Sequence, residues 1–231
     1  MRNGKYGEII YETFDSNESM YTKLQSGESY DILIPSDYMI AKLREEGLLA
    51  ELDFTNIPNA KYILSKYKGL YFDPEDKYTV PYTVGMVGLI YNTKMVKGNP
   101  DSWGLMWDEQ YAGKILMFNN PRDTFGIAQF LLGQSINTNN LKDWDAAIQK
   151  LKEQNPLVAS YVMDEIFGKM ENGEAAIAAY YAGDFLTMYD ENPDLAFVYP
   201  KEGVNFFVEL LVNVIFAPAL NKVTGVIEKL T

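Results

Sequence analysis

Three short polar segments carry side chains that could bind a small charged molecule, and each lies at the end of a segment expected to be a strand. They are Ser36 with Tyr38, Asn119-Asn120-Pro121-Arg122-Asp123, and Tyr181 with Asp184. Open α/β sheets usually bind ligands at the carboxyl ends of their strands. Carboxylates replace the water contacts of an ammonium group, and aromatic faces within about 6 Å attract it. The pattern therefore favours a site for a small cation.

Each segment also has an interpretation that involves no ligand. Ser36 could only cap the following helix, with Tyr38 packed beneath it. Arg122 beside Asp123 could form a local ion pair, which would leave less negative potential for a cation. The 17 tyrosines and 12 phenylalanines are mostly explained by packing, so their number alone identifies no site.

The composition excludes several kinds of chemistry. The chain has no cysteine and no histidine, which removes thiol nucleophiles, disulfides and the commonest metal ligand and general base. No glycine-rich phosphate loop, GxGxxG motif or metal-ligand spacing is present, so we expect neither a metal nor another cofactor. A formal charge of −12 disfavours nucleic acid and attracts cations, although it could serve only solubility. Carboxylate catalysis stays open, but no spacing in the sequence supports it.

The elements that must position these residues alternate between strand-like and helix-like patterns, which indicates an α/β fold with largely parallel sheets. Helices are expected after the polar starts 15–18 and 35–38, after Ser102 and Asn140, and from Asp164 to Gly173. The longest uncharged apolar stretch, 210–220, has about half of the ~20 residues that a spanning helix needs, so we expect no membrane-spanning helix. Strands are expected at 8–14, 31–34, 86–91, 114–118, 158–162, 175–181 and 195–199.

Several sequence blocks in order resemble the spermidine/putrescine-binding proteins of ABC importers, which are type II extracellular solute-binding proteins. The blocks include YETFDSNESMYTKL, YDILIPSDYMIAKLREEGLL, VPYTVG and PKEGVNFF, and the resemblance runs from about Ile10 to Glu209. It implies two α/β lobes with mixed sheets and flanking helices, joined by crossing strands near Gly85 and Val208. Residues 1–85 would form lobe one, residues 86–208 lobe two, and residues 209–231 would return to lobe one. Lobe one looks incomplete, because the family's opening strand and its long C-terminal portion have no counterpart.

The same resemblance implies a set of ligand-binding residues. Asn120 stands where some members have an acid, Phe207 where tryptophan is usual, and Glu209 where aspartate is usual. Phenylalanine offers a weaker cation–π face than tryptophan, so these departures bear on affinity and on the choice of ligand. The implied set is Ser36, Tyr38, Asn120, Asp123, Tyr181, Phe207 and Glu209.

By resemblance, the protein is a non-catalytic, monomeric, extracytoplasmic receptor that delivers a polyamine to the permease of an ABC importer. It would meet the membrane only through the permease or through a lipid anchor outside this chain. The first five residues contain no apolar signal core, which fits a cytoplasmic product, a mature protein or a fragment. The family segments without a counterpart favour a fragment of an exported parent. The alternative is a truncated or decayed relative that keeps the fold, has lost the ligand and serves at most as an interaction module.

Overall fold

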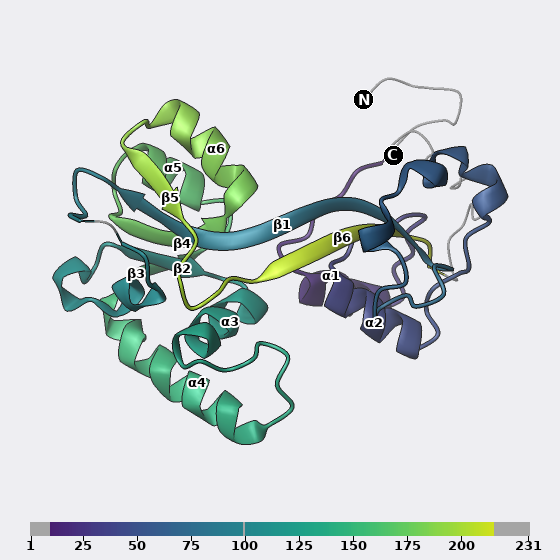
Figure 1. Cartoon of the computed structure of the whole chain (residues 1–231), viewed down its shortest axis with the longest axis horizontal. Helices are drawn as coiled ribbons and strands as arrows, with labels where there is room; N and C mark the ends of the chain where they lie inside the picture. The colour runs from purple at the N-terminus through teal and green to yellow at the C-terminus, as the bar shows by residue number, and fades with distance from the viewer. Residues whose placement is uncertain (1–9, 99, 215–231) are drawn as a thin grey trace. The chain divides into compact units, whose positions relative to one another are not determined.

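The computed structural model describes residues 10–98 and 100–214, and the chain in it forms two units (Figure 1). One unit contains the described residues up to Val84 and those from Phe207 onward, and the other is Gly85–Phe206. Two strands, β1 (Thr79–Asn92) and β6 (Phe206–Val212), pair with each other and carry the chain from one unit to the other. The return segment expected at 209–231 is described as far as residue 214.

The sheet of the second unit is mixed, as the expected fold class requires. Its strand order is β3-β2-β4-β1-β5, with β2 parallel to both of its neighbours and β1 antiparallel to β4 and β5. The largely parallel sheet that the pattern of elements indicated is therefore limited to β3, β2 and β4. The remaining bounds are β2 Ile115–Phe118, β3 Val158–Val162, β4 Ile177–Tyr181 and β5 Leu195–Val198.

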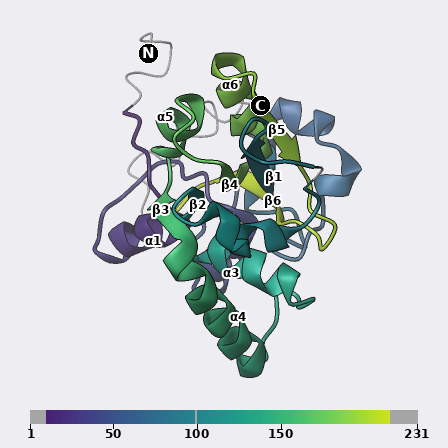
Figure 2. The ribbon, with the colours of Figure 1, turned by 90° about the vertical axis from the view of Figure 1, so that its left-hand side faces the viewer.

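Helices cover both faces of this sheet. Figures 1 and 2 show α3 (Pro121–Leu131) and α4 (Leu141–Gln154) on one side, with α5 (Ile166–Glu171) and α6 (Ala182–Glu191) on the other. All four residues of β2 are buried, as expected for an apolar strand between two helical layers. Short 3₁₀ helices complete the unit at Trp103–Trp107, Glu109–Tyr111 and Asn155–Leu157.

The first unit packs two amphipathic helices against β6. The helix α1 (Asn17–Gln25) buries Met20 and Leu24, and α2 (Asp37–Glu45) buries Met39, Ile40 and Leu43. These side chains share one core with Val208, Leu210 and Val212, which alternate along β6. Further 3₁₀ helices lie at Phe54–Asn56, Pro58–Tyr62 and Ser65–Tyr67.

A buried carboxylate fixes the turn that leads into β1. Asp73 is 2% exposed and accepts hydrogen bonds from the backbone amides of Lys77, Tyr78 and Thr79 at 3.0, 2.8 and 3.0 Å. The Thr79 hydroxyl adds a fourth bond at 2.9 Å. The side chain of Asp73 therefore satisfies three amides before the strand ladder begins.

Several expected elements differ in the structure. Residues 10–14 contain no strand, and the strand expected at 31–34 is a single bridge from Leu33 to Val212. The segment after Ser102 is a 3₁₀ helix, and the helix expected from Asp164 begins at Ile166. The helices α3 and α6 were not expected, because Pro121 and the Ala182-Gly183 pair resemble loop residues.

Candidate functional site

Four side chains of the second unit meet around one carboxylate, and we call them the second-unit group: Asn120, Asp123, Tyr181 and Asn205. The Tyr181 hydroxyl donates to Oδ2 of Asp123 at 2.9 Å, and Nδ2 of Asn120 donates to the same oxygen at 3.1 Å. Nδ2 of Asn205 donates to Oδ1 at 2.8 Å. Three uncharged donors therefore surround the carboxylate of Asp123.

The topology of the sheet explains why these residues meet. The strands β2 and β4 are parallel neighbours, so their carboxyl ends lie at the same edge of the sheet. Tyr181 is the last residue of β4, and Asn120 lies two residues beyond β2. Asn120 is the N-cap of α3, where its side chain accepts from the amides of Arg122 and Asp123. Pro121 suits the first position of α3, because its fixed φ angle is already helical.

Asp123 is buried at the start of a helix. Its side chain is 4% exposed and lies in the first turn of α3, where the helix dipole stabilises an anion. Burial, and then the charge of Asp123, raise the pKa of Tyr181 above its ordinary value. The phenol therefore keeps its proton at neutral pH and donates it to the carboxylate.

The neighbouring charged residues of this unit have other contacts. The Arg122 guanidinium donates to the backbone carbonyl of Ile136 at 2.9 Å and to Oδ1 of Asn137 at 2.7 Å. Asp184, which the sequence placed beside Tyr181, lies in the first turn of α6, where burial and then the charge of Asp164 raise its pKa.

A second group of polar side chains, the first-unit group, contains Asn17, Glu18, Ser36 and Tyr38. Oδ1 of Asn17 accepts from the Ser36 amide at 3.0 Å, and its Nδ2 donates to the Ser36 hydroxyl at 3.1 Å. The Tyr38 hydroxyl donates to Oε1 of Glu18 at 2.9 Å. Ser36 occupies the N-cap of α2, but its side chain makes no capping hydrogen bond. The interpretation of Ser36 as only a cap is therefore wrong.

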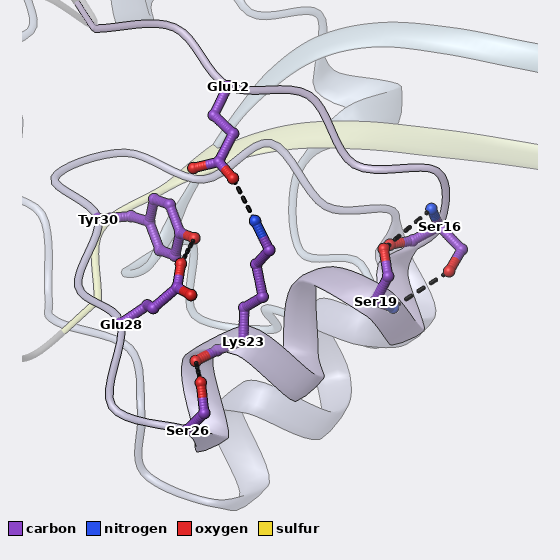
Figure 3. A network of polar contacts seen from close by, with 7 residues as sticks. All are labelled: Glu12, Ser16, Ser19, Lys23, Ser26, Glu28 and Tyr30. Atoms are coloured by element: carbon purple, nitrogen blue, oxygen red, sulfur yellow. Dashed lines mark hydrogen bonds and ion pairs between the residues drawn. The ribbon is translucent and has the colours of Figure 1, made fainter.

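The start of α1 positions Asn17 and Glu18 for these contacts. Ser16 and Ser19 form a reciprocal capping box at the first turn, shown in Figure 3. The same figure shows the ion pair between Lys23 and Glu12 beside the helix. The capping box fixes the start of α1, so Asn17 and Glu18 lie in its first turn.

The two remaining candidates lie on β6. Phe207 and Glu209 alternate with the buried Val208 and Leu210, so both candidates lie on the face of β6 opposite the core shared with α1 and α2. Glu209 pairs with Ser36 in an antiparallel bridge. The structure thus brings Ser36 and Glu209 together within the first unit.

Sequence reasoning missed three members of the two groups: Asn17, Glu18 and Asn205. The first two were interpreted only as parts of a helix start, and that local signal conceals their contacts with α2. Asn205 is 9% exposed, and its one clue was its place just before an apolar strand. A buried amide has no sequence pattern of its own, because its partner can lie anywhere in the chain.

Within residues 10–98 and 100–214, no cluster of three or more acidic side chains could hold a metal ion. None of the helices in this described part has the length and hydropathy needed to span a bilayer.

Comparisons with known proteins relate residues 27–215 to the family model described as bacterial extracellular solute-binding protein. A spermidine/putrescine-binding periplasmic protein of Haemophilus influenzae is 32% identical over 207 residues, with 88% of this chain and 58% of the relative covered. The corresponding protein of Escherichia coli is 31% identical, with coverages of 88% and 59%. This chain therefore spans less than two thirds of the length of these relatives.

A solved structure gives the same result for the fold. The structure of a candidate spermidine/putrescine ABC transporter protein from Listeria monocytogenes is 37% identical and superposes with a TM-score of 0.92. The match covers 97% of this chain and 70% of that one. The α/β fold of the solute-binding class, expected from the sequence, is confirmed. The chain belongs to the bacterial extracellular solute-binding protein family.

Proposed function

We propose that this chain binds a linear polyamine, such as spermidine or putrescine, as the receptor of an ABC importer. The observation that carries the proposal is the buried carboxylate of Asp123, which three uncharged side chains hold by hydrogen bonds. An ammonium group has three donors and no acceptor, so a buried anion is its natural partner.

The arrangement of donors keeps Asp123 useful to such a ligand. Asn120, Tyr181 and Asn205 each donate a hydrogen bond to this carboxylate, and none of the three carries a charge. These donors fix the carboxylate geometry without adding a positive charge. A cation that loses its water at this point gains a charge-assisted hydrogen bond of about 1.5–3 kcal/mol.

We further propose that residues of both groups contact the ligand. Ser36, Tyr38, Phe207 and Glu209 would contribute from the first unit, and Asn120, Asp123 and Tyr181 from the second. In this proposal the two units act as the two lobes, with bounds within two residues of the expected 1–85, 86–208 and 209–231. The phenyl ring of Phe207 would lie against the ligand's methylene chain or an ammonium group.

The names of the relatives support the proposed location and the proposed ligand. Those compared above include spermidine/putrescine-binding periplasmic proteins. We propose that the parent protein works outside the cytoplasm as a monomer, passes its ligand to membrane permease subunits, and catalyses no reaction. The binding step itself requires no cofactor.

A truncated or decayed relative that keeps the fold without the ligand, and serves at most as an interaction module, is the second candidate. The chain covers 58% of the length of the Haemophilus relative, so side chains that complete the site in a full-length protein could lie outside it. Appending the C-terminal portion of that relative separates the two cases. Binding gained on extension indicates truncation, and continued absence of binding indicates a changed pocket.

Isothermal titration calorimetry with spermidine and putrescine tests the leading proposal. We expect saturable heat and a rise in the thermal unfolding midpoint, because a ligand that binds only the folded state stabilises it. A monocarboxylate of similar length serves as the control and should give neither. Folded protein that gives no heat and no midpoint shift at millimolar polyamine contradicts the proposal.

A further inference from the structure

The hydrogen bond between Tyr38 and Glu18 fixes which way the Tyr38 hydroxyl can act. A phenol carries one proton, and Tyr38 donates its proton to Oε1 of Glu18 at 2.9 Å. The lone pairs of the phenol oxygen can then only accept. An ammonium group can only donate, so the polarity of this oxygen matches a cationic ligand and opposes an anionic one.

The first turn of α1 favours an acid at Glu18, but it does not explain why one oxygen of that acid is buried without a donor. Its second carboxylate oxygen, Oε2, is buried and makes no hydrogen bond within the described part of the chain. A buried acceptor without a partner costs about 1–3 kcal/mol. Nor does α1 need Glu18 as a cap, because Ser16 and Ser19 already form the capping box seen in Figure 3.

We propose that Glu18 is a positioning residue for ligand binding: it holds the Tyr38 proton, so that the phenol oxygen accepts a hydrogen bond from a ligand ammonium group. The inference rests on the proposed function, since it takes the ligand to be a polyamine. It adds a residue that acts through Tyr38, and it names a primary or secondary ammonium as the group that Tyr38 recognises.

A double-mutant cycle tests this role. The four proteins are the wild type, Glu18→Gln, Tyr38→Phe and the double variant, each titrated with putrescine. The amide of Glu18→Gln can donate to the phenol, which releases the Tyr38 proton toward the ligand. We expect Glu18→Gln to weaken binding about tenfold in the wild type and less than about twofold in the Tyr38→Phe background.

The chain offers a matched control for the loss of charge. The Tyr21 hydroxyl donates to both oxygens of Glu46 at 2.9 and 2.8 Å in the same unit, but on an exposed surface. Glu46→Gln removes the same charge from a tyrosine–glutamate pair, in which Glu46 also contacts Lys42 at 3.7 Å, and should leave the affinity for putrescine unchanged. Glu18→Gln should not lower the thermal midpoint of the ligand-free protein, whereas a purely structural role for Glu18 predicts a lower midpoint.

The outcomes separate this inference from the proposed function. An equal loss in the Tyr38 and Tyr38→Phe backgrounds means that Glu18 acts only through its charge, which overturns the positioning role. Wild-type binding with an unaffected Glu18→Gln variant overturns the inference and leaves the proposed function intact. A wild-type protein that binds no polyamine overturns both.

Discussion

Replacing Asp123 by asparagine removes the charge proposed to hold the ligand and changes the shape of the side chain very little. An amide oxygen can replace only one of the two carboxylate oxygens. The amide nitrogen of the new asparagine then takes the place of the other oxygen. It faces either the Asn205 amide, now 2.8 Å from Oδ1, or the Tyr181 hydroxyl, now 2.9 Å from Oδ2. Asp123→Asn therefore perturbs both ligand binding and local packing.

The two effects have separate magnitudes. Loss of a charge-assisted hydrogen bond of about 1.5–3 kcal/mol weakens polyamine binding by about 10- to 150-fold. A buried donor left without its acceptor lowers the free energy of unfolding by about 1–3 kcal/mol. Calorimetry measures the first effect, and urea denaturation of the ligand-free protein measures the second.

Two further variants distinguish the local charge from the total charge. Asp190→Asn removes one negative charge from the exposed surface of α6 and should leave the affinity unchanged. Combining Asp123→Asn with Asn205→Asp restores a carboxylate–amide pair and should recover stability, while affinity stays low because the charge has moved. An Asp190→Asn variant that weakens binding as much as Asp123→Asn would refute the reasoning, and so would an Asp123→Asn variant with unchanged affinity.

Asp73→Ala should lower the free energy of unfolding by about 3 kcal/mol or more, because it orphans donors that include the buried amide and hydroxyl of Thr79. Urea denaturation measures this loss; Glu75→Ala, on the exposed surface beside it, should change little. Tyr181→Phe should reduce the loss of stability at alkaline pH. The folded pKa of Tyr181 is raised, so its contribution is complete below the unfolded pKa of about 10 and is lost as pH rises further. Unfolding free energies at about pH 9 and 11 should therefore fall less steeply in the variant, and an unchanged slope would contradict the assigned pKa shift.

Local signals in the sequence predicted the helices α1 and α2 well. Ser16 caps α1, and the buried Met20 and Leu24 follow at helical spacing, so all the information lies within ten residues. The segment 31–34 behaves differently, because its pairing partner Val212 lies far along the chain. Its apolar pattern indicated a strand, but only Leu33 forms a bridge.

The candidate site divides in the same way. The meeting of Asn120, Asp123 and Tyr181 could be predicted, since adjacent parallel strands end at one edge of a sheet. Asn205 and Glu18 could not, because each is defined by one hydrogen bond to a distant residue. The helix α3 was hidden by Pro121, which ends many helices but occupies the first position of this one.

Pairing between tyrosine and a carboxylate is not by itself a sign of function in so acidic a chain. Tyr30 donates to Glu28 at 2.6 Å on the surface, where the carboxylate stays hydrated. No ligand is needed to account for this pair. Asp123 differs because it is 4% exposed, and Glu18 differs because one of its oxygens is buried without a donor. Burying an anion opposes folding, and a chain with a net charge of −12 has no need of buried acids for solubility. In the proposed function, a cationic ligand that has lost its own water would offset this cost, because it would pair with the buried carboxylate.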